Sequence, residues 1–231
     1  MIHQFGQRTI LFDSDGYRLK GHLHLSGQPD APLVVGSHGF LSDGNSPKLA
    51  ALANQCNRCG IGFFRFDHRG CGQSEGVFEA GASVTARRND ILNAIDALKE
   101  MGFAKNGLGL FGSSMGGAAS LAAAMATQID AIVTYAAPIQ IPSSQPTHEK
   151  DTALRFDVDF DFTNIHDILV LHGDADTVVP ISHGREIYAQ SKRPKQMILQ
   201  KGGDHPMSNP HHQQAFVREA VYWFRASFER I

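Results

Sequence analysis

Ser114 stands between two glycines in a pattern that suits an exposed nucleophile. Gly112-Ser113-Ser114-Met115-Gly116 follows the apolar run GLGLF and precedes a stretch rich in alanine. A strand that turns sharply into a helix here would strain the backbone of Ser114 and project its hydroxyl at the edge of a sheet. The turn is so tight that Gly112 and Gly116 could carry no side chain. Ser113 is off-centre in the pattern, and we expect it to point away.

A serine hydroxyl becomes a good nucleophile only with a neighbouring base, and that base needs an acid to orient it. The chain order expected for this turn is serine, then aspartate or glutamate, then histidine. The stretch LHGDADTVVP at 171–180 places Asp176 after an apolar run and before the next expected helix. Asp174 is the alternative acid, but as the first acid of GDAD it is better placed to bind loop backbone. We therefore expect Asp176 to be the acid.

His205 is the candidate base. It lies in KGGDHPMSNP at 201–210, a glycine-rich stretch that follows the strand-like run KQMILQ. Serine, aspartate and histidine would then all lie in loops at the carboxyl ends of strands, where open α/β sheets build their sites. His211 and His212 are the alternative bases, but we expect them to open the last helix and face solvent. Asp204 is expected to point elsewhere, because adjacent residues cannot easily share one site.

Acyl transfer also needs donors for the negative charge that develops on the carbonyl oxygen. The backbone N–H of Met115, at the start of the expected helix, is one candidate. The loop GSHGFLSDG at 36–44 follows the strand-like run PLVV, and the backbone N–H of Phe40 in that loop is the second candidate. His38 in the same loop is interpreted as a loop-shaping residue rather than a second base.

The elements that must position these loops alternate along the chain. RTILFD (8–13) and YRLKGHLHL (17–25) indicate an antiparallel pair, the second half-buried by its alternation. Six short apolar runs suit strands buried on both faces, at 32–38, 61–66, 107–111, 131–135, 167–173 and 195–200. Helical patterns fall at 47–59, 83–101, 115–126 and 211–229, with Ser83 as a possible N-cap. The sequence therefore predicts a three-layer α/β/α sandwich around a mostly parallel eight-stranded sheet.

One segment interrupts this alternation. Residues 138–165 hold three prolines, several acids and little periodicity, which predicts a short cap or a long surface loop within a single domain spanning 1–231. Five apolar residues are the candidate lining of a substrate pocket that would favour an aromatic or short acyl group: Phe40, Leu41, Ile139, Ile141 and Phe160.

Four reactive or charged residues are interpreted as structural. Asp67 and Arg69 follow the run IGFFRF, and we expect an internal ion pair or a loop brace rather than a substrate contact. Cys56 and Cys59 lie late in a helical stretch without a second pair of ligands, so they are expected to pack in the core rather than bind zinc.

Composition excludes several classes of function. The 231 residues are 42% hydrophobic with a net charge of −2, which fits a globular protein and lacks the basic patch of a nucleic-acid binder. No apolar run is long enough to span a membrane, and the first residues do not read as a secretion signal. Three cysteines do not make a disulfide framework, so a cytoplasmic location is expected. We expect no metal and no cofactor.

Five motifs together resemble the α/β-hydrolase fold. They are HGF at 38–40, FDHRGCGQSEG at 66–76, GSSMG at 112–116, HGDADTVVP at 172–180 and GGDH at 202–205, in the family's order. Within the fold, the chain is most similar to small carboxylesterases of the cinnamoyl- and feruloyl-esterase and monoacylglycerol-lipase kinds. The resemblance implies a Ser114–His205–Asp176 triad, an oxyanion hole of Phe40 and Met115, and a small-molecule ester as substrate.

Other functions remain open on the same residues. A thioesterase, a peptidase or amidase, and an acyltransferase would all pass through the same acyl-enzyme, so the triad alone does not separate them. A binding protein that kept the fold without activity is the other alternative, although no member of the triad is missing from the sequence.

Overall fold

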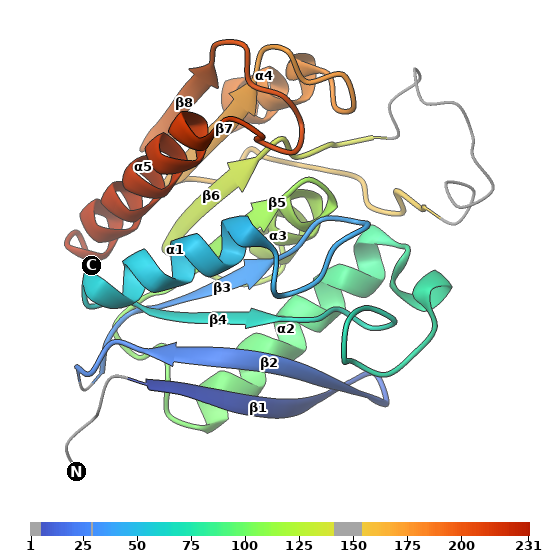
Figure 1. Ribbon diagram of the computed structural model, residues 1–231, viewed down its shortest axis with the longest axis vertical. Helices are drawn as coiled ribbons and strands as arrows, with labels where there is room; N and C mark the ends of the chain where they lie inside the picture. Colours follow the sequence, from blue (N-terminus) through green and yellow to red (C-terminus); the bar gives the residue numbers. More distant parts are fainter. Residues whose placement is uncertain (1–5, 29, 141–153) are drawn as a thin grey trace.

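The computed structural model describes residues 6–28, 30–140 and 154–231. Its eight strands form one sheet in the order β1-β2-β4-β3-β5-β6-β7-β8 (Figure 1). Only β2 runs against its neighbours, and the five remaining strand pairs are parallel. The strands are β1 (Gly6–Ser14), β2 (Tyr17–Leu25), β3 (Leu33–Ser37), β4 (Gly62–Phe66), β5 (Leu108–Ser113), β6 (Ala131–Tyr135), β7 (Ile168–Gly173) and β8 (Lys195–Gln200).

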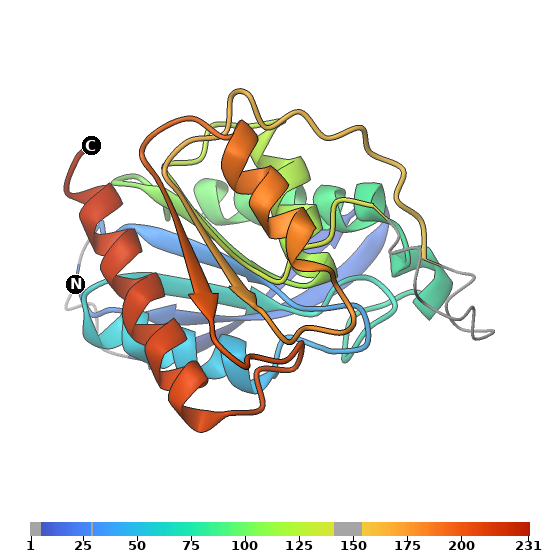
Figure 2. The same cartoon turned by 90° about the horizontal axis from the view of Figure 1, so that it is seen from above.

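Helices cover both faces of the sheet, as Figures 1 and 2 show. One face carries α1 (Pro47–Arg58) and α5 (Pro210–Phe228), and the other carries α2 (Val84–Glu100), α3 (Met115–Ala124) and α4 (Ile181–Gln190). A short 3₁₀ helix, η1 (Phe78–Gly81), precedes α2. The predicted three-layer α/β/α sandwich around a mostly parallel eight-stranded sheet is therefore confirmed. No helix in the described part of the chain is long and apolar enough to cross a membrane.

The central strands read as unbroken apolar runs because they are buried on both faces. Every residue of β3, β4, β5, β6 and β7 is buried, whereas the edge strands β1 and β8 are largely accessible. Helices of the two outer layers pack on this sheet in two separate apolar clusters. A sheet with this much burial places the carboxyl ends of its parallel strands side by side at one edge, where loops can meet.

Local capping decides where the helices begin. Ser83 accepts a hydrogen bond from Ala86 N at 3.0 Å at the start of α2, as its position predicts. Asn209 accepts from His211 N and precedes Pro210 at the start of α5. The aromatic stripe predicted for this last helix faces the core, because Phe216, Trp223 and Phe224 are all buried. The predicted helix boundaries lie within two residues of those observed.

The predicted excursion at 138–165 is described at its two ends, and residues 141–153 lie outside the described residues. Its second end is tied to the start of α2. Arg155 exchanges backbone hydrogen bonds with this region, since its N–H donates to Ala82 O at 2.7 Å and its carbonyl accepts from Val84 N. Asp157 accepts from the Ser83 hydroxyl at 2.8 Å. Whether the segment works as a lid stays a prediction.

A buried polar cluster ties α2 to strands β1 and β3 and to the loop after β4. The Asp90 carboxylate, with no exposed surface, accepts hydrogen bonds from Ser14 Oγ at 2.7 Å, His68 Nδ1 at 3.1 Å and Arg69 Nε at 2.8 Å. His68 Nε2 lies 2.7 Å from Ser37 Oγ. Burial lowers the pKa of His68 to about 4, so its ring is neutral and donates from Nδ1 to Asp90. Ser37, His68 and Asp90 repeat the residue types of a catalytic triad, but all three are inaccessible to a substrate.

We expect Asp90→Asn to lower the free energy of unfolding by about 3 kcal/mol near pH 7, because it breaks a buried ion pair with Arg69. Burial alone would raise the pKa of Asp90, but the hydrogen bonds from His68 and Arg69 outweigh it and hold that pKa below its ordinary value. Stability from a lowered carboxyl pKa is present at neutral pH and is lost as pH falls through the folded-state pKa.

The difference between wild type and Asp90→Asn should therefore shrink below about pH 4, as measured by urea unfolding at several pH values. Asp96→Asn, an exposed position on the same helix, is the matched control and should leave stability nearly unchanged. Equal stability of the two variants at pH 7 would show that the cluster does not contribute as an ion pair.

Candidate active site

Ser114 occupies the sharp turn between β5 and α3. Its backbone has φ 54° and ψ −126°, a strained conformation for a residue with a side chain. A Cβ on Gly112 would come 2.3 Å from Gly116 O, and a Cβ on Gly116 would come 2.3 Å from Ser37 O. The two glycines of the motif are therefore required by contacts across the turn. Tyr135 at the end of β6 holds the turn in place, because its carbonyl accepts from Ser114 N at 2.8 Å.

The structure brings Ser114, His205 and Asp176 together from three separate loops. His205 Nε2 lies 3.0 Å from Ser114 Oγ, and His205 Nδ1 lies 2.8 Å from Asp176 Oδ2. The Asp176 side chain is completely buried and that of His205 is 18% exposed. A hydroxyl, an imidazole and a carboxylate in this order can pass a proton from the serine to the histidine.

Asp176 is held by the backbone as well as by His205. Its Oδ1 accepts from Val178 N and Val179 N, both at 2.8 Å, which leaves Oδ2 facing the histidine. His172 Nε2 lies 3.6 Å from the same Oδ2 and hydrogen-bonds with Val179 O at 2.9 Å. Burial would raise the pKa of Asp176, but the hydrogen bonds from His205 and from the two N–H groups outweigh it and lower that pKa. The carboxylate is thus ionised and fixed in orientation at neutral pH.

Two side chains that the sequence did not single out hold the loop of His205. Tyr135 donates its hydroxyl to Asp204 O at 2.5 Å, and Lys48 donates its ammonium to Pro206 O at 3.1 Å. These are the carbonyls on either side of His205. The Lys48 ammonium also lies 5.1 Å from the centre of the Tyr135 ring, a cation–π distance. The only sequence signal was the tyrosine that ends the mostly apolar run AIVTY.

The alternative acids are not hydrogen-bonded to His205. Asp174 accepts from Gly202 N at 2.6 Å and so ties two loops together, as its sequence position suggested. Asp204 caps the backbone of Ser208 at 2.7 Å.

The alternative serine and histidines also lie apart from the hydrogen-bonded group. Ser113 makes no hydrogen bond with His205. His211 opens α5 and is exposed, whereas His212 is half-buried rather than fully solvent-facing.

Two backbone N–H groups are free to face an oxyanion. Met115 is the first residue of α3, where N–H groups have no partner within the helix. Among the described residues, neither the Met115 N–H nor the Phe40 N–H takes part in a hydrogen bond. The loop of Phe40 lies against the nucleophile, since a Cβ built on Gly39 would be 3.5 Å from Ser114 Cβ.

The two charged residues of the loop after β4 have structural contacts: Asp67 binds backbone N–H groups and Arg69 forms ion pairs. Asp67 accepts from Gly44 N at 2.7 Å and from Gln73 N at 2.8 Å. Arg69 forms its ion pairs with Asp90 and Asp15, at 2.7 and 2.8 Å, and not with Asp67. Both residues therefore hold the loop in place. Arg69 pairs with Asp90 because the chain leaving β4 passes beside the first turns of α2.

Cavities lie at both ends of the parallel strands, and only one contains Ser114. It has a volume of about 460 Å³ and includes Ser114 and His205 in its lining, with Lys48 and Gln213 among its polar residues. That volume suits a small organic ligand. Its apolar walls are Phe40, Leu41, Met115, Pro138, Leu154, Phe156, Val178 and Val179.

Two of the five residues predicted to line this cavity do so. Phe40 and Leu41 lie in its wall, and the excursion contributes through Leu154 and Phe156 instead of the residues expected. Ile139 and Phe160 lie outside the lining because both pack against the apolar core, Phe160 by stacking on Phe162. Ile141 lies outside the described residues.

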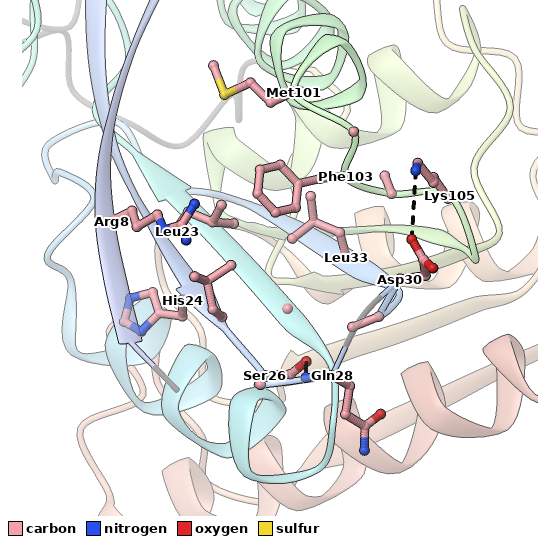
Figure 3. A pocket seen from close by; sticks show the side chains of 16 residues that line it. Arg8, Leu23, His24, Ser26, Gln28, Asp30, Leu33, Met101, Phe103 and Lys105 are labelled. Atoms are coloured by element: carbon pink, nitrogen blue, oxygen red, sulfur yellow. Dashed lines mark hydrogen bonds and ion pairs between the residues drawn. The ribbon is translucent and has the colours of Figure 1, made fainter. Parts of the chain in front are cut away.

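A second cavity, of about 570 Å³, lies at the amino ends of β3 and β4 (Figure 3). Leu23 and Leu33 form part of its lining, and Arg8, Asp30 and Lys105 contribute its charged side chains. The figure shows an ion pair between Lys105 and Asp30 in this lining, at 3.8 Å. Its only imidazole, His24, accepts a hydrogen bond from Arg65 Nε at 2.9 Å, so no serine–histidine pair forms there. The smaller cavity is the candidate active site.

We also searched the described part of the chain for possible metal ligands and reactive thiols. No three His, Cys, Asp or Glu side chains gather there in a way that could hold a metal ion. Cys56 is buried in the core and Cys59 is half-buried, and both are free thiols. Burial raises the pKa of the Cys56 thiol, so it is an inert packing residue.

Comparison with known proteins places the chain in a family. Residues 28–157 match the family model described as serine aminopeptidase, S33. The chain belongs to this family. It is an enzyme, a hydrolase with the α/β-hydrolase fold.

Three similar proteins illustrate the range of relatives. An uncharacterised protein, YfhR, of Salmonella typhi is 28% identical over 209 residues, covering 80% of this chain and 70% of that protein. The mitochondrial palmitoyl-protein thioesterase ABHD10 of Mus musculus is 28% identical over 215 residues, covering 76% and 69%. The solved structure of Est1E from Butyrivibrio proteoclasticus with ferulic acid bound has a TM-score of 0.78 and 22% identity, covering 95% of this chain and 99% of that one.

Proposed function

We propose that this hydrolase cleaves carboxylic esters through an acyl-enzyme on Ser114. The observation that carries the proposal is the hydrogen-bonded series from Ser114 Oγ through His205 to Asp176, at 3.0 and 2.8 Å, beside a cavity with mostly apolar walls. The strained turn at Ser114 supports the same role, because such strain is characteristic of nucleophiles at this kind of strand-to-helix turn.

The first half-reaction acylates the serine. His205 Nε2 takes the proton of Ser114 as Oγ forms a bond to the acyl carbon, and the carbonyl electron pair moves onto the oxygen. The N–H groups of Phe40 and Met115 hold this oxyanion, and losing one such donor typically costs about 3 kcal/mol of transition-state stabilisation. The oxyanion then collapses, the ester C–O bond breaks, and His205 gives its proton to the leaving alcohol.

The second half-reaction releases the acid. His205 removes a proton from a water molecule as that water attacks the acyl carbon, and the Ser114 oxygen leaves with the proton returned by His205. Asp176 stays ionised throughout, because it is held by two backbone N–H groups and stabilises the imidazolium. The acyl group occupies the apolar part of the cavity, which supports short aliphatic or aromatic acids as products.

Thioesters are the second candidate substrate. The mouse relative is named a palmitoyl-protein thioesterase, and its match covers about three quarters of this chain. The same acyl-enzyme forms from an ester or a thioester, since only the leaving group differs.

The test is a substrate panel with matched acyl groups. We expect p-nitrophenyl acetate and butyrate to be hydrolysed, with turnover at least about tenfold faster than butyryl p-nitroanilide, because an anilide is the poorer leaving group. S-butyryl thiocholine reports thioester cleavage with the same acyl chain. Turnover of the thioester alone would move the proposal to thioesterase, and turnover of the anilide alone would favour a peptidase or amidase.

A further inference from the structure

Arg87, in the first turns of α2, is fully buried beside the proposed oxyanion hole. All five of its N–H donors have partners. Nε donates to Gly81 O at 2.9 Å, Nη1 donates to His38 O at 3.0 Å and to Gly39 O at 3.1 Å, and Nη2 donates to Phe40 O at 3.2 Å. The fifth contact is from Nη2 to Cys71 Sγ at 3.6 Å. Three consecutive carbonyls of the loop that carries Phe40 thus converge on one side chain.

The contact with Gly39 O fixes the direction of the Phe40 N–H. The carbonyl of Gly39 and the N–H of Phe40 belong to one planar trans peptide, so they point in opposite directions. Because the carbonyl faces Arg87, the N–H must face away from Arg87. Gly39 itself lies against Ser114, so an N–H that faces away from Arg87 can face the nucleophile.

His38 reinforces the same peptide orientation. Its Nε2 accepts from His68 N at 3.1 Å, so the ring proton is on Nδ1, 2.8 Å from Gly39 O. The Gly39 carbonyl therefore receives two hydrogen bonds. Donation to a carbonyl polarises the whole peptide and makes its N–H a stronger donor.

No carboxylate neutralises Arg87 directly. Among the described residues, no Asp or Glu oxygen lies within 4.0 Å of its guanidinium, unlike Arg69 nearby, which has two such partners. The facing groups are four carbonyls, the Cys71 thiol and the Phe40 ring, whose centre is 5.9 Å from Arg87 Cζ. Burying a charged side chain without a carboxylate partner costs free energy. Here the buried guanidinium is bound instead by carbonyls of the loop that carries Phe40, beside the nucleophile, which points to a functional role for Arg87.

We infer that Arg87 is a positioning residue for the oxyanion hole. It sets the Gly39–Phe40 peptide with its N–H toward Ser114, and its positive charge favours the negative oxygen formed in the transition state. The inference rests on the proposed acyl transfer at Ser114, but it holds for an ester or a thioester alike. Its specific consequence is a loss of transition-state stabilisation without a loss of substrate binding.

The experiment compares Arg87→Met, Arg87→Lys and the control Arg88→Met with wild type. Arg88 is the next residue of the same helix, and among the described residues its guanidinium hydrogen-bonds only with the side chain of Asn89. Arg87→Met is expected to lower kcat by about 100-fold with KM within about threefold. Arg87→Lys keeps the charge and some donors, so it should recover part of that loss. Arg88→Met should match wild type.

Inhibitor affinity separates positioning from general loosening of the fold. A trifluoromethyl ketone adds to Ser114 Oγ and forms a tetrahedral oxyanion, whereas butyramide, with the same acyl chain, binds as a neutral, planar amide. In Arg87→Lys and Arg87→Met, affinity for the ketone should fall in parallel with kcat/KM while affinity for the neutral butyramide stays nearly unchanged. A loss of both affinities by the same factor would assign Arg87 a purely structural role.

Stability and labelling complete the design. Where Arg87→Met does not fold, as judged by circular dichroism, Arg87→Lys decides the question: kcat at the wild-type level overturns the inference. The rate of fluorophosphonate labelling of wild type and Ser114→Ala tests the nucleophile without any ester. An unlabelled wild type would overturn the proposed function, whereas a labelled wild type with equally fast labelling of Arg87→Met would overturn only the role of Arg87.

Discussion

Replacing Ser114 by alanine is expected to lower kcat for p-nitrophenyl butyrate on the order of 10⁶-fold, the loss seen when the nucleophile of such a triad is removed. The reason is local. His205 Nε2 and the two free N–H groups remain in place, but no oxygen is left 3.0 Å from the imidazole to form the acyl-enzyme. Alanine can occupy the same left-handed backbone conformation with a strain similar to that of serine, so the fold should be retained.

Ser113→Ala is the matched control for this prediction. It removes a hydroxyl from the adjacent position without touching the hydrogen bond to His205. Steady-state rates and fluorophosphonate labelling of the two variants, at equal thermal stability, give the comparison. Labelling of Ser114→Ala at the wild-type rate, or loss of activity in Ser113→Ala alone, would move the nucleophile to the other serine.

The fold was predictable because strands that are buried on both faces appear in the sequence as short, nearly continuous apolar runs. Runs such as AIVTY and DILVLHG are mostly apolar, and each forms a central strand within one residue of its predicted bounds. Caps were equally local: Ser83 and Gly102 mark the two ends of α2 through the residue types that helix termini prefer.

The three loops of the candidate site were predictable for a different reason. A parallel sheet aligns the carboxyl ends of its strands, so residues just after three strands must meet at one edge. Asp176 and His205 follow β7 and β8, and Ser114 follows β5, which is enough to expect their approach. The place of Asp174 as the first acid of GDAD then separated it from Asp176, because an acid there can bind loop backbone, and Asp174 does accept from Gly202 N in the structure.

The supporting residues could not be predicted from the sequence. Arg87 and Lys48 look like ordinary polar residues at the starts of helices, and their roles depend on which carbonyls the tertiary fold presents to them. Tyr135 contacts a loop that lies far along the chain. The expected lining residues Ile139 and Phe160 failed for the same reason, since periodicity is weak in the excursion and gives no direction for a side chain.

Asp176→Asn is expected to lower kcat about 10⁴-fold with KM little changed, because it should trap His205 in the wrong tautomer. The argument uses the two oxygens of the carboxylate. Oδ1 accepts from Val178 N and Val179 N, so the amide oxygen of the asparagine must take that place. Its NH₂ group then occupies the position of Oδ2, 2.8 Å from His205 Nδ1, and donates to it.

An accepting Nδ1 forces the imidazole proton onto Nε2, the atom that must take the proton of Ser114. The variant should therefore fold and bind product normally while losing acylation and fluorophosphonate labelling alike. Asp174→Asn is the matched control, because it makes the same change on the same loop, where the carboxylate accepts a hydrogen bond from Gly202 N and from no other group in the described part of the chain. A larger loss in Asp174→Asn, or an Asp176→Asn variant within tenfold of wild type, would mean that another group orients His205. His172, 3.6 Å from the Asp176 carboxylate, would then be the next residue to replace, because it reaches the same oxygen from the end of β7.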